Sequence, residues 1–208
     1  TNHSRQIPGV LKYVASTAIQ GVHGGEPPFD AVAELWWEDL EAVRNSYLET
    51  TWNATRTEHT SFLSGRFMFE CDEHTFLTAP ADAGVKYMAF LNRKDGISRE
   101  AFNTYFLEQH VPLALETPKL LGYRASTAFA SANGDSLMKE TPDAPPFDGV
   151  VEMWFADVAS FEEAFRDPHW ETLRLDAYNN LANGLMQVLL EEHLLFDHLT
   201  TGVSNGNA

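Results

Sequence analysis

The chain has 208 residues, 44% apolar and 21% charged, which is enough to bury a core without disulfides or structural metals. Thirty acidic residues against fourteen Lys and Arg give a formal charge of −16, which disfavours phosphate backbones and anionic membrane surfaces. We therefore expect neither a nucleic-acid nor a membrane partner. The sequence has no apolar run of membrane-spanning length and no basic leader, and its single cysteine is Cys71. These features favour a reducing, cytoplasmic setting.

Two parts of the sequence resemble each other. Residues 27–63 align on 145–181 with 11 identities in 37 positions, and residues 8–18 align on 118–128 with 7 in 11. This similarity predicts a duplication, with a first repeat over residues 1–80, a second over 81–199 and a disordered tail at 200–208. The segment 85–116 has no counterpart upstream, so the first repeat lacks its opening strand and helix in this sequence.

Hydrophobic periodicity and turn residues predict the elements of both repeats. The first repeat reads as strands near 9–19 and 31–37, a helix near 41–62 and a strand near 66–77. The second opens with a strand at 85–92 and a helix from Ser98, its cap, towards Glu116. Strands at 123–130 and 149–155 follow, separated by a polar loop. A capping box at Ser160–Glu163 predicts the start of the next helix, Asp167-Pro168 restarts it, and the last strand covers 185–195.

The order β-α-β-β-α-β in the second repeat is that of a ferredoxin-like unit, with both helices on one face of the sheet. The other face is apolar and must be covered. We therefore predict an α+β fold in which two ferredoxin-like repeats, the first lacking its N-terminal β-α, pack sheet to sheet as an α+β barrel.

The second repeat resembles the EthD family of dimeric α/β-barrel proteins. The similarity is carried by Leu91–Phe102, Tyr105-Phe106, His110–Ala114, Pro118–Tyr123, Phe147–Trp154 and Glu192-His193. Related barrels include polyketide cyclases, lactone isomerases, aromatic monooxygenases, dehydratases and heme-handling proteins. The resemblance implies the fold more firmly than the reaction, because one fold hosts many sites. It also implies that the position of His110 lines the pocket, and that a homodimer is a possible assembly.

His110 is the first candidate catalytic residue. It follows Phe102 and Phe106 at intervals of four, so the three share a helical stripe that should face the sheet. An imidazole in an apolar cavity can be neutral near pH 7 and accept or return a proton. The alternative is a hydrogen-bonded structural histidine near a helix bend at Pro112.

Two further residues are candidates for catalysis. Glu152 shares a strand face with Trp154, so burial against the indole could raise its pKa, unless Arg124 or Arg174 pairs with it. Tyr123 could orient a carbonyl or phenol, or simply pack. We expect five residues to bind the substrate, one of them from the first repeat: Trp154, Phe102, Phe106, His193 and Trp36.

These residues predict a cofactor-independent enzyme that acts by proton transfer on a small aromatic, polyketide-like or lactone substrate. Cyclases, isomerases and dehydratases or other lyases use such chemistry. We expect no metal, because the histidines lack ligand spacing, and no cofactor. The resemblance implies that a heme-ligating His would stand near the position of Arg174, and the arginine there disfavours heme. The alternatives are a non-catalytic barrel that binds a hydrophobic ligand, and a heme-dependent or cofactor-free oxygenase.

Overall fold

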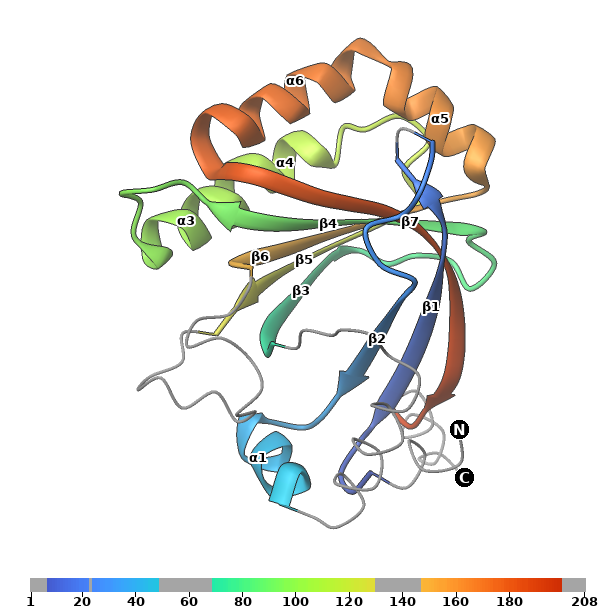
Figure 1. Cartoon of the computed structure of the whole chain (residues 1–208), viewed down its shortest axis with the longest axis vertical. Coiled ribbons are helices and arrows are strands. Elements are labelled where there is room, and N and C mark those ends of the chain that lie inside the picture. Colours follow the sequence, from blue (N-terminus) through green and yellow to red (C-terminus); the bar gives the residue numbers. More distant parts are fainter. Residues whose placement is uncertain (1–6, 23, 49–68, 130–146, 200–208) are drawn as a thin grey trace, which may run out of the picture. The chain divides into compact units, whose positions relative to one another are not determined.

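The structure is a computed structural model that describes residues 7–22, 24–48, 69–129 and 147–199 (Figure 1). The chain divides into two compact units. The smaller comprises residues 1–16, 31–67 and 193–208, and the larger comprises 17–30 and 68–192. The larger unit contains every predicted catalytic residue.

Five strands of the larger unit form an antiparallel sheet in the order β7-β4-β6-β5-β3. They are β3 (Cys71–Leu77), β4 (Val85–Arg93), β5 (Gly122–Ala128), β6 (Gly149–Phe155) and β7 (Ala182–Asp197), the last of which continues into the smaller unit. Among the described residues between them in the chain are four α-helices and two π-helical segments: α3 (Arg99–Tyr105), η2 (Phe106–His110), α4 (Val111–Ala114), α5 (Val158–Arg166), α6 (Pro168–Asp176) and η3 (Ala177–Leu181). The predicted α+β class and the β-α-β-β-α-β order are therefore confirmed.

Alternation along the strands gives the sheet two distinct faces. Tyr87 pairs with Met153, which pairs with Tyr123, and these side chains face the helices. The neighbouring row contains Met88, Glu152 and Arg124 and faces the opposite side. The helices α3, α4, α5 and α6 lie together on one face of the sheet (Figure 1).

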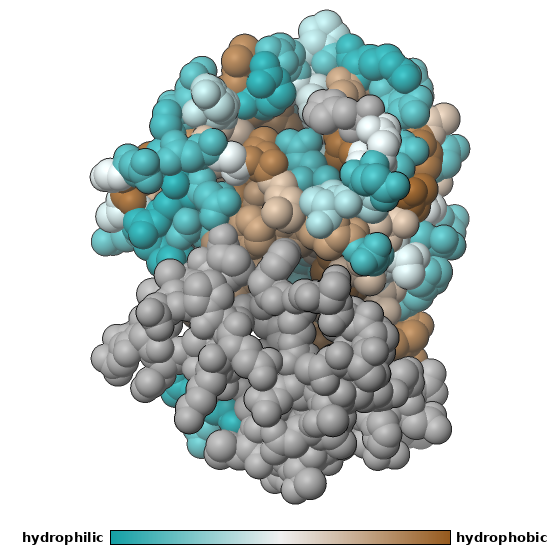
Figure 2. All heavy atoms as spheres, viewed as in Figure 1, coloured by the Kyte–Doolittle hydropathy of each residue, from teal (hydrophilic) through white to brown (hydrophobic). Residues whose placement is uncertain are grey.

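The core lies between the sheet and these helices. Tyr87 stacks on Phe161 with ring centroids 5.6 Å apart, and Trp170 meets both rings edge-on. Phe106, Val111 and Ala114 are fully buried in the same core. Burial of this aromatic and aliphatic surface is the main stabilising contribution to the larger unit. The outer side of the helices is mostly hydrophilic in Figure 2.

Helix caps explain two of the boundaries. Ser98 Oγ accepts from Ala101 N at 3.1 Å and begins α3, and Asp167 accepts from His169 N and begins α6. Both caps were predicted. The predicted start of the previous helix at Ser160 is wrong: Asp157 is the cap and accepts from Ser160 N at 2.7 Å, so α5 begins three residues earlier.

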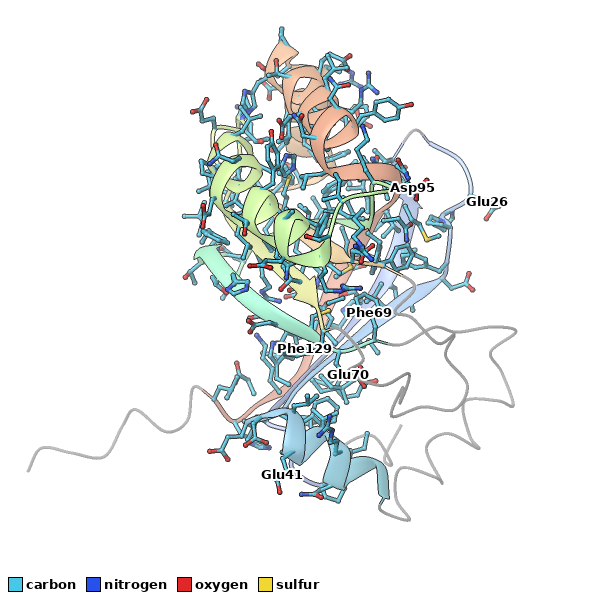
Figure 3. All side chains as sticks on the ribbon, turned by 90° about the vertical axis from the view of Figure 1, so that its left-hand side faces the viewer. Glu26, Glu41, Phe69, Glu70, Asp95 and Phe129 are labelled. Atoms are coloured by element: carbon cyan, nitrogen blue, oxygen red, sulfur yellow. The ribbon has the colours of Figure 1, made fainter. Side chains whose placement is uncertain are left out.

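A backbone hydrogen bond joins the residue before β3 to the residue after β5. Phe129 N donates to Glu70 O at 3.0 Å, and the two residues lie close together in Figure 3. The polar loop predicted between β5 and β6, and most of the helix predicted near 41–62, lie outside the described residues.

The smaller unit contains β2 (Ala31–Trp36), α1 (Leu40–Leu48) and parts of β1 (Lys12–Gly21) and β7, in the strand order β2-β1-β7. Asp39 Oδ1 accepts from Ala42 N at 2.8 Å and begins α1. The elements described within residues 1–80 occur in the predicted order, β1-β2-α1-β3. In the described part of the chain, no helix is long and apolar enough to cross a bilayer.

Candidate functional site

His110 lies in the helical layer and is paired with Asp176. Its side chain is buried, and its Nδ1 atom is 2.7 Å from Asp176 Oδ2. An ionised carboxylate only accepts hydrogen bonds, so Nδ1 donates its proton to Asp176. The other ring nitrogen, Nε2, then has its lone pair available, and the structure gives it no hydrogen bond to any described residue. This is the arrangement of a histidine that can accept a proton from a ligand.

Two π-helical turns bring this pair together. The first, η2, closes with the amide of Val111 donating to Phe106 O, five residues earlier. The second, η3, closes in the same way from Ala182 to Ala177. His110 ends the first turn, and Asp176 immediately precedes the second. π-helical turns are rare and occur frequently at functional sites, so their coincidence at this pair marks it as a candidate site.

The carboxylate of Asp176 is held from two more directions. Tyr105 donates its hydroxyl proton to Oδ1 at 2.6 Å, and Asn180 Nδ2 donates to the same oxygen at 2.9 Å. Burial alone would raise the pKa of Asp176, but the hydrogen bonds from Tyr105, His110 and Asn180 outweigh it and lower that pKa. Asp176 is therefore an anion near neutral pH.

Burial and the contact with Asp176 also shift the pKa values of His110 and Tyr105. Burial lowers the pKa of His110, and although the hydrogen bond and charge of Asp176 act in the opposite sense, the net shift is downward. Burial and then the contact with Asp176 raise the pKa of Tyr105 to about 12. Near pH 7, His110 is thus neutral and Tyr105 is protonated, which suits a base and a hydrogen-bond donor.

Aromatic rings lie on one side of His110. The ring centroids of Phe102 and Phe106 are 5.6 Å apart, and those of Phe106 and His110 are 6.1 Å apart. The predicted stripe is therefore continuous and buried. Gly149 on β6 makes room for it, since a Cβ atom there would lie 3.1 Å from Phe102 and 3.2 Å from Phe106.

Glu152 lies on the opposite face of the sheet from this core. Its carboxylate is 3.1 Å from Lys86 Nζ and 3.3 Å from Arg124 Nη1. Lys86, which is fully buried, also contacts Glu192 at 2.8 Å. The Arg124 pairing is one of the two alternatives raised from the sequence, whereas Arg174 pairs with Glu171. The structure therefore gives Glu152 charged partners of its own and does not bring it to His110.

Trp154 belongs to the same charged cluster. Lys86 Nζ lies 5.4 Å from the centre of its ring and Arg124 Cζ lies 5.1 Å from it. An indole face stabilises such cations.

Phe90 lies on the same face of the sheet as Glu152. Its ring contacts three other aromatic rings at centroid distances of 5.1–6.4 Å, those of Phe29, Phe69 and Phe147.

Tyr123 lies on the helix-facing side of β5, the same side as His110. It is fully buried, and its hydroxyl has no hydrogen-bond partner among the described residues. Burial, and to a smaller extent the nearby Tyr87, raises the pKa of its hydroxyl, which remains protonated. A buried hydroxyl without a partner is costly unless a ligand or water satisfies it.

His193 and Trp36, the remaining predicted binding residues, lie in the smaller unit. His193 is exposed on β7, and Trp36 is half-buried on β2 with Lys12 Nζ 4.7 Å from its ring centre. An open polar hollow of about 380 Å³ lies at the turn between β4 and α3, beside Arg93 and Asp148, and none of the predicted site residues lines it.

The sequence did not identify Asp176, Tyr105, Asn180 or Lys86 as site residues. Asp176 is 66 positions from His110, and nothing in its local sequence distinguishes it from other helical acids. The position of Lys86 could have been predicted. Side chains alternate along this strand, so Lys86 lies on the face of Glu152 and not in the helix-side core. Among the described residues, no group of three or more His, Cys, Asp or Glu is arranged to hold a metal ion.

Comparisons with known proteins bear on the fold and the family. The EthD domain family matches residues 94–184, a range that includes Tyr105, His110, Asp176 and Asn180. No curated protein matches the sequence.

Solved structures share the fold at low sequence identity. An anthrone oxidase-like protein superposes with a TM-score of 0.66 at 8% identity, over 95% of this chain and 84% of that one. A candidate monooxygenase from Lactobacillus acidophilus NCFM gives 0.53 at 13% identity, over 93% and 83%. Another candidate monooxygenase, from Fusobacterium nucleatum subsp. nucleatum, gives 0.52 at 12% identity, over 90% and 77%. At these identities the similarity shows the fold alone, and the EthD domain model matches residues 94–184 of this chain.

Proposed function

We propose that the protein is a cofactor-independent enzyme that moves a proton on a small aromatic, polyketide-like or lactone substrate, as cyclases, isomerases and lyases do. The observation that carries this proposal is the pair of buried His110 and half-buried Asp176, 2.7 Å apart, with no hydrogen bond from Nε2 of the histidine to any described residue. A neutral imidazole oriented by a carboxylate is an effective general base.

The proton transfer uses His110 in both directions. Its Nε2 removes a proton from an acidic C–H or O–H of the substrate, and Asp176 stabilises the imidazolium that forms. The same nitrogen then returns the proton to another substrate atom or to a leaving hydroxyl. Phe102 and Phe106 favour an apolar, aromatic substrate beside the ring. Tyr123, whose hydroxyl has no partner among the described residues, donates to a substrate oxygen. Glu152, bound to Lys86 and Arg124, takes no part in this step.

A cofactor-free oxygenase is the second candidate, because the solved structures that share this fold include an anthrone oxidase-like protein and candidate monooxygenases. It begins with the same proton removal. For anthrone itself, the carbanion would react with dioxygen, giving anthraquinone and water from one anthrone and one O₂. The two candidates therefore differ in whether oxygen is consumed after His110 has acted.

The test measures proton removal and oxygen consumption separately. Anthrone is incubated with the protein in deuterated buffer under nitrogen, and deuterium incorporation at its CH₂ carbon is followed by mass spectrometry. Oxygen uptake is then measured in air. The control variant is His74→Gln, at a partly exposed histidine of β3, against His110→Gln.

Three results separate the functions. Exchange that needs His110, without oxygen uptake, supports the proton-transfer enzyme, and exchange with stoichiometric oxygen uptake supports the oxygenase. If anthrone binds, as judged by quenching of tryptophan fluorescence, and exchanges no faster than in buffer alone, the protein is a binding barrel for that ligand and the catalytic proposal fails.

A further inference from the structure

The hydrogen bonds around Asp176 extend the candidate site to two residues, Tyr105 and Asn180, for which the sequence predicted no role. Oδ2 of the carboxylate faces His110, and Oδ1 receives both Tyr105 and Asn180, at 2.6 and 2.9 Å. Three donors from three different segments therefore converge on one carboxylate. A carboxylate bound on both oxygens has little freedom to rotate.

The π-helical turn η2 explains how Tyr105 and His110 reach the same acid. In a regular α-helix, residues five apart differ by roughly 140° around the axis, so they would point to different sides. A π-helical turn closes its hydrogen bond from i to i+5, which places residues five apart nearly above one another. Tyr105 and His110 are five apart: Tyr105 immediately precedes η2, and His110 is its last residue. The local geometry is thus matched to two contacts with Asp176.

Asn180 reaches the acid from the other turn. It lies four residues after Asp176 within η3, and its side-chain amide folds back onto Oδ1. Lys94 Nζ donates to the carbonyl oxygen of the adjacent Asn179 at 2.9 Å, which ties the same turn to the end of β4. Oδ1 is therefore contacted from α3 and from η3, a turn that is itself joined to the end of β4.

We infer that Tyr105 and Asn180 are positioning residues that act through Asp176 to keep His110 in the tautomer with a proton on Nδ1 and none on Nε2. The inference rests on the proposed function, since this tautomer matters for catalysis only if Nε2 is the base. Without these two donors the carboxylate can rotate away, and the imidazole loses the partner that selects its tautomer.

The test reads the tautomer directly, without a substrate. The imidazole nitrogen chemical shifts of ¹⁵N-labelled protein distinguish a protonated from an unprotonated ring nitrogen at a pH above the histidine pKa. The proteins compared are wild type, Asn180→Ala and Tyr105→Phe/Asn180→Ala. Matched controls are Asn179→Ala and Tyr178→Phe, which change exposed side chains in the same turn. His110→Gln assigns the signals, and amide spectra verify the fold.

The expected result is a wild-type His110 that is predominantly the Nδ1–H form, a partial loss of that preference in Asn180→Ala and a larger loss in the double variant. The controls should match wild type. If wild type has the Nδ1–H form and all variants retain it, the positioning role is wrong and the proposed base survives. If wild type itself has the Nε2–H form, the proposed function fails together with the inference. Because Asn180 is exposed, its single substitution also yields a result if the double variant does not fold.

Discussion

His110 and Asp176 are 66 residues apart in the chain, and their side chains meet at 2.7 Å in the buried helical layer. The acid supplies what the histidine lacks, because an imidazole surrounded by apolar groups has no fixed tautomer and poorly stabilises the charge it gains on accepting a proton. This relationship links the fold to the proposed chemistry, and the first two predictions depend on it.

Substitution of the acid should impair catalysis more than binding. We expect Asp176→Asn to lower kcat by about 10²-fold or more with little change in KM, because the amide neither selects the tautomer nor stabilises the imidazolium. Steady-state kinetics on a substrate identified by the exchange assay measures this effect. A variant that retains wild-type kcat would remove Asp176 from the mechanism. Glu171→Gln, at an exposed acid of the same helix, is the matched control.

The pH dependence of activity should follow the lowered pKa of His110. A general base must be neutral, so kcat/KM should rise with pH with its midpoint below the ordinary 6.5. A rise centred above 6.5 would contradict the assignment. The measurement is a pH profile in which enzyme stability has been verified at each point.

The free energy of unfolding should also depend on the protonation of His110. Between the lowered pKa of folded His110 and 6.5, the unfolded chain binds more protons than the folded chain, so the free energy of unfolding rises with pH there. Equivalently, this contribution to stability is lost as the pH falls below 6.5. Denaturant titrations at several pH values should show this slope in wild type and a smaller slope in His110→Gln. Equal slopes in the two proteins would show that His110 does not carry the effect.

The buried ion pair of Lys86 and Glu152 should be strongly coupled. We expect Lys86→Met and Glu152→Gln each to lower the free energy of unfolding by about 3 kcal/mol, at the lower end for a broken buried pair, because each survivor retains another partner. The double variant should lose clearly less than the sum of the two. The exposed pair of Glu162 and Arg166 is the control, with an expected coupling of about 0.5 kcal/mol or less. Additive losses at Lys86 and Glu152 would contradict a direct interaction between them.

A methyl group at Gly149 should destabilise the protein. Gly149→Ala places a Cβ atom against the rings of Phe102 and Phe106, and overpacking of this kind costs about 1–3 kcal/mol. Gly184→Ala on β7 is the matched control, since a Cβ atom there meets nothing within 4 Å. The measurement is the difference in unfolding free energy between the two variants. Similar free energies of unfolding for the two variants would contradict the prediction, because the rings of Phe102 and Phe106 would then move aside at little cost.

The sequence predicted the parts of this structure that depend on local patterns. Alternation along 149–155 correctly separated the face of Glu152 from that of Met153, and the caps at Ser98 and Asp167 follow from short-range hydrogen bonding. The cap at Asp157 was missed because Ser160-Phe161-Glu162-Glu163 matched a capping box equally well.

The site itself required the tertiary structure. The stripe of Phe102, Phe106 and His110 was predictable from intervals of four, and the three residues are buried as expected. The single helix predicted over 98–116 is instead α3, the π-helical η2 and α4, and no residue pattern announces the i to i+5 bond. The contact between His110 and Asp176 depends on how two helices pack, and one sequence contains no signal for that pairing.

The central claim is that His110 removes a proton from the bound ligand, and the most direct measurement is the rate of deuterium exchange under nitrogen in wild type against His110→Gln. With both proteins folded and ligand bound to each, we predict that exchange falls by about 10²–10⁴-fold in the variant, the usual contribution of a general base. Exchange at the wild-type rate in His110→Gln would contradict the account.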